Sequence, residues 1–164
     1  SVMPFFLNKK NIGEKFLPIT DDQMTRFNIS LKDGCEMVFY AIEKAWGGEV
    51  FVPKIPSYKI SDVATAIAPE LEHKVVGIRP GEKLHEEMIT SSDSYNTVDL
   101  GKYYAILPQK SPYSQYSKGD YKEAFNGKDV PNGFSYNSGN NSDWESIESL
   151  RELVRIHVDS NFKI

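Results

Sequence analysis

Residues 74–89 read KVVGIRPGEKLHEEMI, and this run carries the clearest structural signal in the chain. Its first five residues are rich in β-branched side chains and predict a strand that ends at Ile78. Pro80-Gly81 predicts a turn, and the residues from Lys83 to Ile89 predict a helix. A strand joined to a helix by a short turn is typical of an α/β protein. It places Arg79 at the strand end, where ligands tend to bind in such folds.

Two arginine motifs suggest a site for a phosphorylated ligand. Arg79 offers a planar fork that matches phosphate oxygens, and Glu82 can accept hydrogen bonds from vicinal hydroxyls such as those of a ribose. Thr25-Arg26 forms the second motif and is weak by itself. A solvated turn with a surface charge pair is the alternative for the Arg79 motif, and a surface arginine is the alternative for Thr25-Arg26. Convergence of Arg26 and Arg79 on one diphosphate would favour the binding site.

The remaining pattern predicts short strands between helices. Helical signals are Pro4 in a first turn, Ser30 as an N-cap with Asp33 in the turn that follows, and apolar residues at helical spacing. The predicted helices span residues 1–10, 31–45, 60–68 and 147–158, and the predicted extended segments span 16–20, 49–53, 74–78, 97–100 and 103–107. The last two segments flank Gly101-Lys102 and predict a hairpin.

Composition changes after Pro108, where the chain becomes rich in Ser, Tyr, Asn, Gly and Lys. We therefore expect a lobe at 1–107, an irregular arm at 108–145, and a C-terminal helix and tail at 146–164. The chain opens directly into apolar sequence without an initiator Met, which favours a cut inside a larger protein. An uncovered apolar patch is expected to follow from such a cut.

The overall charge and cysteine content exclude several classes of protein. Nineteen basic and 23 acidic residues give a net charge of −4, which argues against a nucleic-acid binder. The single cysteine, Cys35, cannot form a disulfide within the chain, and we expect it to be a small buried hydrophobe. Neither a signal peptide nor a membrane span is visible, so a cytoplasmic location is expected.

Several catalytic patterns are absent or weak. Gly-x-Gly-x-x-Gly and the phosphate-binding loop do not occur, and the three histidines lack metal-ligand spacing, so neither a cofactor nor a metal site is expected in this chain. Tyr40 and Lys44 have the Tyr-x-x-x-Lys spacing of short-chain dehydrogenases. They lie among the apolar positions of a predicted helix, so the structural interpretation is favoured over the catalytic one.

Several stretches together resemble a known enzyme family. They are SVMPFF at 1–6, ITD and MTRF at 19–27, GGEVFVPK at 47–54, VVGIRPGEKLHEEMI at 75–89, YNSG at 136–139 and VDSNF at 158–162. In this order they resemble the inverting UDP-N-acetylglucosamine 4,6-dehydratases of pseudaminic acid and polysaccharide biosynthesis. The resemblance covers nearly the whole chain and is weakest at 109–135.

The resemblance implies the C-terminal substrate-binding lobe of an extended short-chain dehydrogenase/reductase, with the Rossmann half missing. In that family NADP takes a hydride from sugar C4, water is lost across C5 and C6, the hydride returns to C6, and C5 is epimerised. The product is a UDP-4-keto-6-deoxy-hexose used in flagellin glycosylation. The catalytic residues and the NADP site lie upstream of this chain, so the fragment alone is expected to be inactive.

The resemblance carries over only substrate-binding residues. It implies that Val2, Pro4 and Phe5 line a uracil pocket, that Arg26 and Arg79 bind the diphosphate, that Glu82 holds the ribose, and that Thr25 supports the site. It also implies a UDP-sugar ligand and a homo-oligomeric complete enzyme, with no nucleic acid or membrane partner. Two alternatives remain: another UDP-sugar epimerase or dehydratase, and a non-catalytic nucleotide-sugar-binding or oligomerisation module.

Overall fold

The computed structural model describes residues 2–109 and 116–164. They form a mixed α/β fold that divides into two units, each built from separate stretches of chain. Unit 1 comprises Ser1–Asn28, Pro56–Glu86 and Ser138–Ile164, and unit 2 comprises Ile29–Ile55 and Glu87–Asn137. These boundaries follow packing, whereas the predicted division at 107 and 145 follows composition and stays a prediction.

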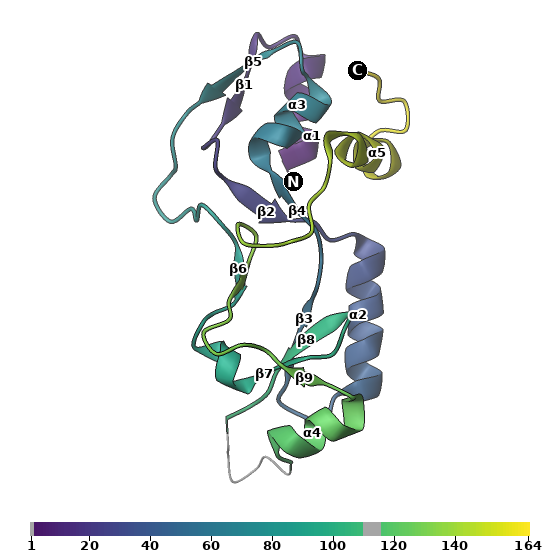
Figure 1. Cartoon of the computed structure of the whole chain (residues 1–164). Coiled ribbons are helices and arrows are strands. Elements are labelled where there is room, and N and C mark those ends of the chain that lie inside the picture. Colours follow the sequence, from purple (N-terminus) through teal and green to yellow (C-terminus); the bar gives the residue numbers. More distant parts are fainter. Residues whose placement is uncertain (1, 110–115) are drawn as a thin grey trace. The chain divides into compact units, whose positions relative to one another are not determined.

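In unit 1, helices pack against two small sheets (Figure 1). Parallel strands β1 and β5 form one sheet, antiparallel strands β2 and β4 form the other, and α3 packs between α1 and α5. Ala64, Ala66 and Ala68 are fully buried, and their small side chains let neighbouring elements approach α3 closely. The elements are α1 (Val2–Asn11), β1 (Phe16–Ile19), β2 (Thr25–Phe27), β4 (Ser57–Lys59), α3 (Ile60–Ile67), β5 (Glu72–Val75) and α5 (Ile147–His157).

Unit 2 is built on an antiparallel four-stranded sheet in the order β3-β8-β7-β9. Strand β6 pairs separately with β10, and Val98, Ala105 and Tyr121 form the centre of a small core. The elements are α2 (Leu31–Lys44), β3 (Val50–Pro53), β6 (Glu87–Ile89), the 3-10 turn η1 (Asp93–Asn96), β7 (Thr97–Asp99), β8 (Tyr103–Ile106), α4 (Lys118–Phe125), β9 (Lys128–Asp129) and β10 (Tyr136–Asn137).

Most predicted elements are confirmed because their signals are local. Ser30 caps α2 by accepting a hydrogen bond from the Asp33 backbone N–H. The hairpin of β7 and β8 turns at Gly101, whose φ of 85° favours glycine. The predicted strands at 49–53 and 16–20 and the helices at 1–10, 60–68 and 147–158 also form, with ends that differ by one or a few residues.

The predicted helix at 83–89 is wrong. Residues 83–86 are irregular and β6 follows, because their backbone groups bond to distant partners instead of to one another. The Leu84 carbonyl accepts from Thr25 N–H, and Ser138 Oγ accepts from Glu86 N–H. The preceding strand also ends earlier than predicted, at Val75, so Arg79 lies on a turn beyond the strand.

The segment predicted as an irregular arm contains regular structure in its described part. Helix α4 begins with a capping box, in which Ser117 and Asp120 exchange side-chain to backbone hydrogen bonds. Its Tyr121 is fully buried. The part of the predicted arm at 110–115 lies outside the described residues.

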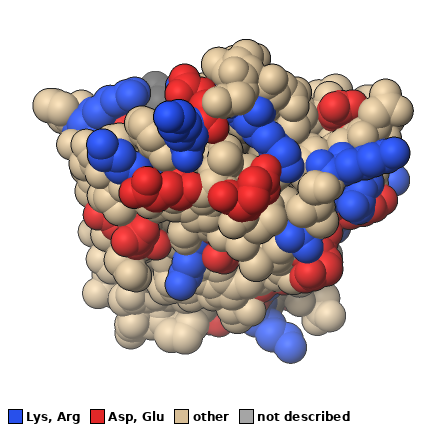
Figure 2. All heavy atoms as spheres, turned by 90° about the horizontal axis from the view of Figure 1, so that it is seen from above, with Lys and Arg blue, Asp and Glu red and all other residues tan. Residues whose placement is uncertain are grey.

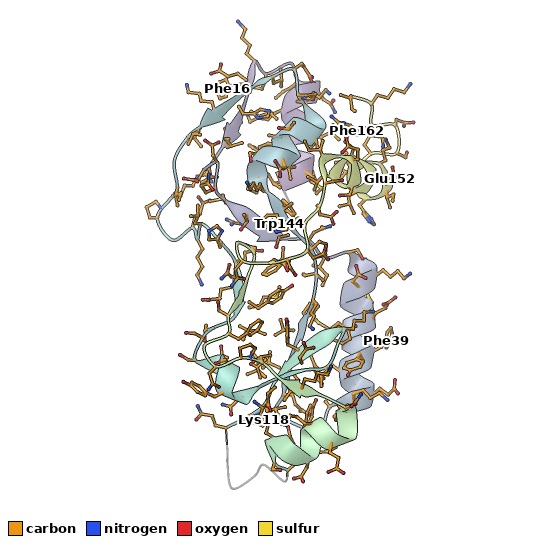
Figure 3. All side chains as sticks on the ribbon, viewed as in Figure 1. Phe16, Phe39, Lys118, Trp144, Glu152 and Phe162 are labelled. Carbon is orange, nitrogen blue, oxygen red and sulfur yellow. The ribbon has the colours of Figure 1, made fainter. Side chains whose placement is uncertain are left out.

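The prediction that Cys35 is a small buried hydrophobe is wrong, because Cys35 lies on α2 and is exposed. No residue of α2 is buried, although its apolar side chains follow a helical stripe. Phe39, which is labelled in Figure 3, lies on this helix. Phe39 is 70% exposed and Ile42 is 77% exposed. The stripe is Leu31, Cys35, Val38, Phe39 and Ile42. Spacing identifies the apolar face of a helix but not what covers it.

Among the residues that the structure describes, no helix is long and apolar enough to cross a membrane. Tyr40, the tyrosine of the Tyr-x-x-x-Lys pattern, packs against Phe51 and Tyr103, and burial raises its pKa. Lys44 pairs with the adjacent Glu43. These contacts give Tyr40 a packing role in unit 2.

The exposed stripe on α2 predicts self-association of the chain at high concentration. Replacing Phe39 and Ile42 together by Glu should lower the apparent mass in light scattering, because two charges would interrupt the apolar surface. Ile156→Glu is the control, since Ile156 is 61% exposed on α5 in the other unit. An equal loss of self-association in the control, or a wild type that stays monomeric, would contradict the prediction.

Removing the hydroxyl group should have opposite effects on stability at two buried tyrosines. Within residues 2–109 and 116–164, Tyr121 Oη is buried without a hydrogen-bond partner, and burial raises the pKa of this phenol. Tyr136 Oη accepts from Ile55 N–H and donates to its carbonyl, at 3.0 Å each. Tyr121→Phe should therefore keep or increase the free energy of unfolding, whereas Tyr136→Phe should lower it by about 1–2 kcal/mol. Urea denaturation measures both, and a larger loss for Tyr121→Phe would refute the assignment.

Candidate functional site

Unit 1 contains a pocket of about 600 Å³. This volume lies within the usual range of small-molecule sites. Eight of the twelve lining residues are apolar or aromatic, and four are polar or charged. The lining residues are Val2, Phe5, Phe6, Pro18, Thr20, Met24, Arg26, Tyr58, Ile60, Val76, Arg79 and Glu82.

Five of the seven predicted site residues lie together on this pocket: Val2, Phe5, Arg26, Arg79 and Glu82. The two arginines come from different stretches of unit 1 and share one cavity. Pro4 and Thr25 are not among the lining residues. Pro4 is exposed on α1, and Thr25 is only 2% exposed because its side chain points into a buried polar cluster.

The turn at Arg79–Glu82 presents two of the charged groups. Glu82 N–H donates to the Arg79 carbonyl at 3.0 Å, and Gly81 has a φ of 87°, as a turn with Pro at its second and Gly at its third position requires. Glu82 Oε2 accepts from Arg79 N–H at 3.0 Å. In the described part of the chain, the Arg79 guanidinium has no hydrogen-bond acceptor. All its donors are therefore available to a ligand.

Arg26 is held much more firmly than Arg79. Its Nη1 donates to the Thr25 carbonyl at 2.6 Å and to the Leu84 carbonyl at 3.2 Å, and Nη2 donates to Met24 Sδ at 3.2 Å. Nε lies 3.8 Å from Glu86 Oε1. A guanidinium has five N–H donors, so Arg26 can offer a ligand only the Nε and one Nη2 donor. It is a fixed positive charge with limited hydrogen-bonding capacity.

Sequence reasoning missed several lining residues, of which Tyr58 is the most informative. Tyr58 lies directly opposite Arg26 in the β2–β4 pair. Burial raises the pKa of its phenol, the Glu86 carboxylate raises it further, and Arg26 opposes both. Tyr58 therefore contributes a neutral hydroxyl and an aromatic face. No local pattern identifies it, because β2 and β4 are 30 residues apart in the chain.

The charge on the surface is mixed. On the face shown in Figure 2, basic and acidic side chains are interspersed, and neither sign forms a broad patch. The charges on this face therefore do not produce a long-range field of one sign.

Comparison with known proteins shows the family of this chain. Residues 1–108 match the family described as Polysaccharide biosynthesis protein. The chain belongs to this family. It is 48% identical over 160 residues to the UDP-N-acetylglucosamine 4,6-dehydratase (inverting) of Campylobacter jejuni strain 81-176, covering 94% of this chain and 46% of the relative.

Two other relatives widen the comparison. UDP-glucose 4-epimerase of Rickettsia canadensis is 39% identical over 110 residues, which cover 65% of this chain and 32% of the relative. The X-ray structure of Pen from Bacillus thuringiensis aligns with a TM-score of 0.73 and 27% identity, over 94% of this chain and 45% of that one. The chain thus spans about half the length of the dehydratase and of Pen, and this family member is a homologue of the inverting dehydratases.

The different surroundings of the two arginines predict different effects on stability. Arg26→Ala removes three hydrogen bonds and should lower the free energy of unfolding by about 2 kcal/mol. Arg79→Ala removes no side-chain hydrogen bond to the described residues and should change it by less than about 0.5 kcal/mol. Chemical denaturation of both variants tests the contrast. Equal losses would show that the guanidinium of Arg79 is also tied to the protein.

Proposed function

We propose that the pocket of unit 1 binds the UDP portion of UDP-N-acetylglucosamine, and that this chain is the substrate-binding part of an inverting 4,6-dehydratase. The observation that carries the proposal is the meeting of Arg26, Arg79 and Glu82 at one cavity with an aromatic lining. Guanidinium groups suit a diphosphate, and a carboxylate suits the two hydroxyls of a ribose. The similarity to the Campylobacter jejuni enzymes supports the choice of nucleotide sugar.

Each lining group has a proposed role. Val2 and Phe5 contact the uracil ring, Arg79 binds the diphosphate through several donors, and Arg26 adds a fixed charge with one or two. Glu82 accepts from the ribose hydroxyls through the oxygen that does not bond Arg79 N–H. We propose that Pro4, on α1, completes the uracil side of the pocket. Thr25 supports Arg26 without lining the pocket itself.

The chemical step belongs to the complete enzyme. The family resemblance implies NADP, which would take up and return a hydride. The residues present here do not fit that group, because the sequence has no Gly-x-Gly-x-x-Gly turn between a strand and a helix. We therefore derive no hydride step from this chain. Its residues bind and orient the nucleotide, so the isolated chain is proposed to lack dehydratase activity.

A 4-epimerase acting on a UDP-sugar is the second candidate, and the similarity to the Rickettsia epimerase favours it. Both candidates require the same nucleotide in the pocket. NMR analysis of the product made by the complete enzyme separates them, because a dehydratase yields a 4-keto-6-deoxy sugar and an epimerase keeps the 6-hydroxyl. For the dehydratase, we propose a homo-oligomeric complete enzyme and a product for surface polysaccharide or pseudaminic acid synthesis.

The proposal predicts that this chain binds UDP and that Arg79→Ala weakens binding by about ten- to a hundred-fold, since a charge-assisted hydrogen bond contributes roughly 1.5–3 kcal/mol. Isothermal titration calorimetry with UDP measures the effect. Arg155→Ala is the matched control, because it removes the same charge from α5 of unit 1, where Arg155 pairs with Glu152. Unchanged UDP affinity in Arg79→Ala would remove Arg79 from the site, and equal weakening in the control would point to net charge alone.

A further inference from the structure

Three separated stretches of unit 1 meet at the hydroxyl of Thr25. Thr25 Oγ1 lies 2.7 Å from His85 Nδ1 and 2.7 Å from Ser138 Oγ. Thr25 belongs to β2, His85 follows the Arg79–Glu82 turn, and Ser138 follows β10. Thr25 and Ser138 are 2% and 0% exposed, so the cluster is closed to solvent on that side. None of the three residues lines the pocket.

The donors and acceptors of this cluster have one arrangement that uses every proton. Ser138 Oγ already accepts from Glu86 N–H at 2.9 Å. If Ser138 donates to Thr25 Oγ1 and Thr25 donates to His85 Nδ1, both hydroxyl protons have acceptors, and the ring proton of His85 is on Nε2. The opposite direction leaves the Ser138 proton without an acceptor among the described residues. Because unpaired buried donors are costly, the first arrangement is favoured.

Gly139 provides the space for this arrangement. A Cβ atom at position 139 would lie 2.7–2.8 Å from three atoms of the His85 ring, closer than any side chain tolerates. The backbone also ties Ser138 to the cluster, because Ser138 N–H donates to the Glu86 carbonyl at 2.8 Å. The ring of His85 is therefore fixed by the chain at 138–139 on one side and by Thr25 on the other.

The cluster acts on the pocket through Arg26. The two carbonyls that hold Arg26 Nη1 belong to Thr25 and to Leu84, the neighbour of His85. Thr25 N–H donates to the Leu84 carbonyl at 3.0 Å, so these two acceptors are also locked to each other. Any shift of His85 away from Thr25 would move one of the carbonyls and change the position of the guanidinium.

We propose that Thr25, His85 and Ser138 are positioning residues that set the place of Arg26 at the pocket and thereby its contact with the diphosphate of the ligand. This inference rests on the proposed function of the pocket. It assigns a role to His85 and Ser138 and places Thr25 behind the site instead of at the ligand. Thr25, His85 and Ser138 touch neither ligand nor reacting atoms and work only through Arg26.

Substitutions at Thr25 and His85 in this chain, with UDP as the probe, test the proposal. Thr25→Val keeps the shape of the side chain but loses its hydroxyl, and calorimetry should show about ten-fold weaker UDP binding. Thr25→Ser keeps the hydroxyl and should bind within about two-fold of wild type. His85→Ala should match Thr25→Val, whereas His85→Asn should recover most of the affinity because its side-chain oxygen can accept at the position of Nδ1.

The control is Thr97→Val in unit 2. Thr97 is also fully buried, and its Oγ1 donates to the Asp93 carbonyl at 2.8 Å. This variant should lose stability without losing UDP affinity. A double-mutant cycle distinguishes the positioning of Arg26 from a purely structural role of Thr25. In an Arg26→Ala background, Thr25→Val should have no further effect on UDP affinity.

The outcomes separate the inference from the function on which it rests. A wild-type chain that does not bind UDP overturns the proposed function. Wild-type binding that Thr25→Val leaves unchanged overturns the positioning role alone. Additive losses in the cycle with Arg26→Ala also overturn it, because Thr25 would then act independently of Arg26.

Discussion

The pocket depends on how the backbone of residues 84–86 satisfies its hydrogen bonds. The backbone groups of this segment bond to distant partners instead of to one another. Thr25 N–H donates to the Leu84 carbonyl, and Ser138 bonds both the backbone N–H and the carbonyl of Glu86. These bonds hold the segment in an irregular path beside β2. The turn before it, which carries Arg79 and Glu82, therefore opens onto the same cavity as Arg26.

The two arginines at this cavity combine opposite properties. Three N–H donors of Arg26 bond to the protein, so the side chain is already ordered in the folded chain. Ligand binding would therefore cost little further side-chain entropy at Arg26. The Arg79 guanidinium has no acceptor among residues 2–109 and 116–164, so it can adjust to a ligand, although binding would then order a long side chain. A fixed charge that sets the location and an adaptable one that completes the contacts suit a flexible diphosphate.

The sequence predicts those features that depend on interactions between residues close together in the chain. The cap at Ser30, the turn at Pro80-Gly81 and the β7–β8 hairpin are confirmed because each depends on residues within a few positions of one another. The helix predicted at 83–89 does not form. Apolar spacing gives no information about the distant partners Thr25 and Ser138, whose hydrogen bonds with residues 84 and 86 replace those of a helix.

Other features of the structure depart from the sequence-based prediction for different reasons. The capping box at Ser117–Asp120 is a local signal that indicates the start of α4, although the composition of that region is typical of irregular structure. Tyr58 enters the pocket through the pairing of β2 with β4, and no local pattern shows such a pairing. Arginines that match a phosphate ligand were recognisable by chemistry alone, but their meeting in one cavity depends on the packing of unit 1.

Unit 1 closes its pocket with three passes of the chain, and each pass has a different task. The first carries Arg26, the second carries Arg79 and Glu82, and the third contributes Ser138 and Gly139, which support the first two without reaching the cavity. All the groups suited to a nucleotide lie on the first two passes. With the proposed nucleotide in the pocket, these two passes would hold two phosphates and a ribose, whichever sugar is attached to them. The third pass bears on the pocket through Arg26, because the position of this guanidinium is only as well defined as the hydrogen bonds behind it.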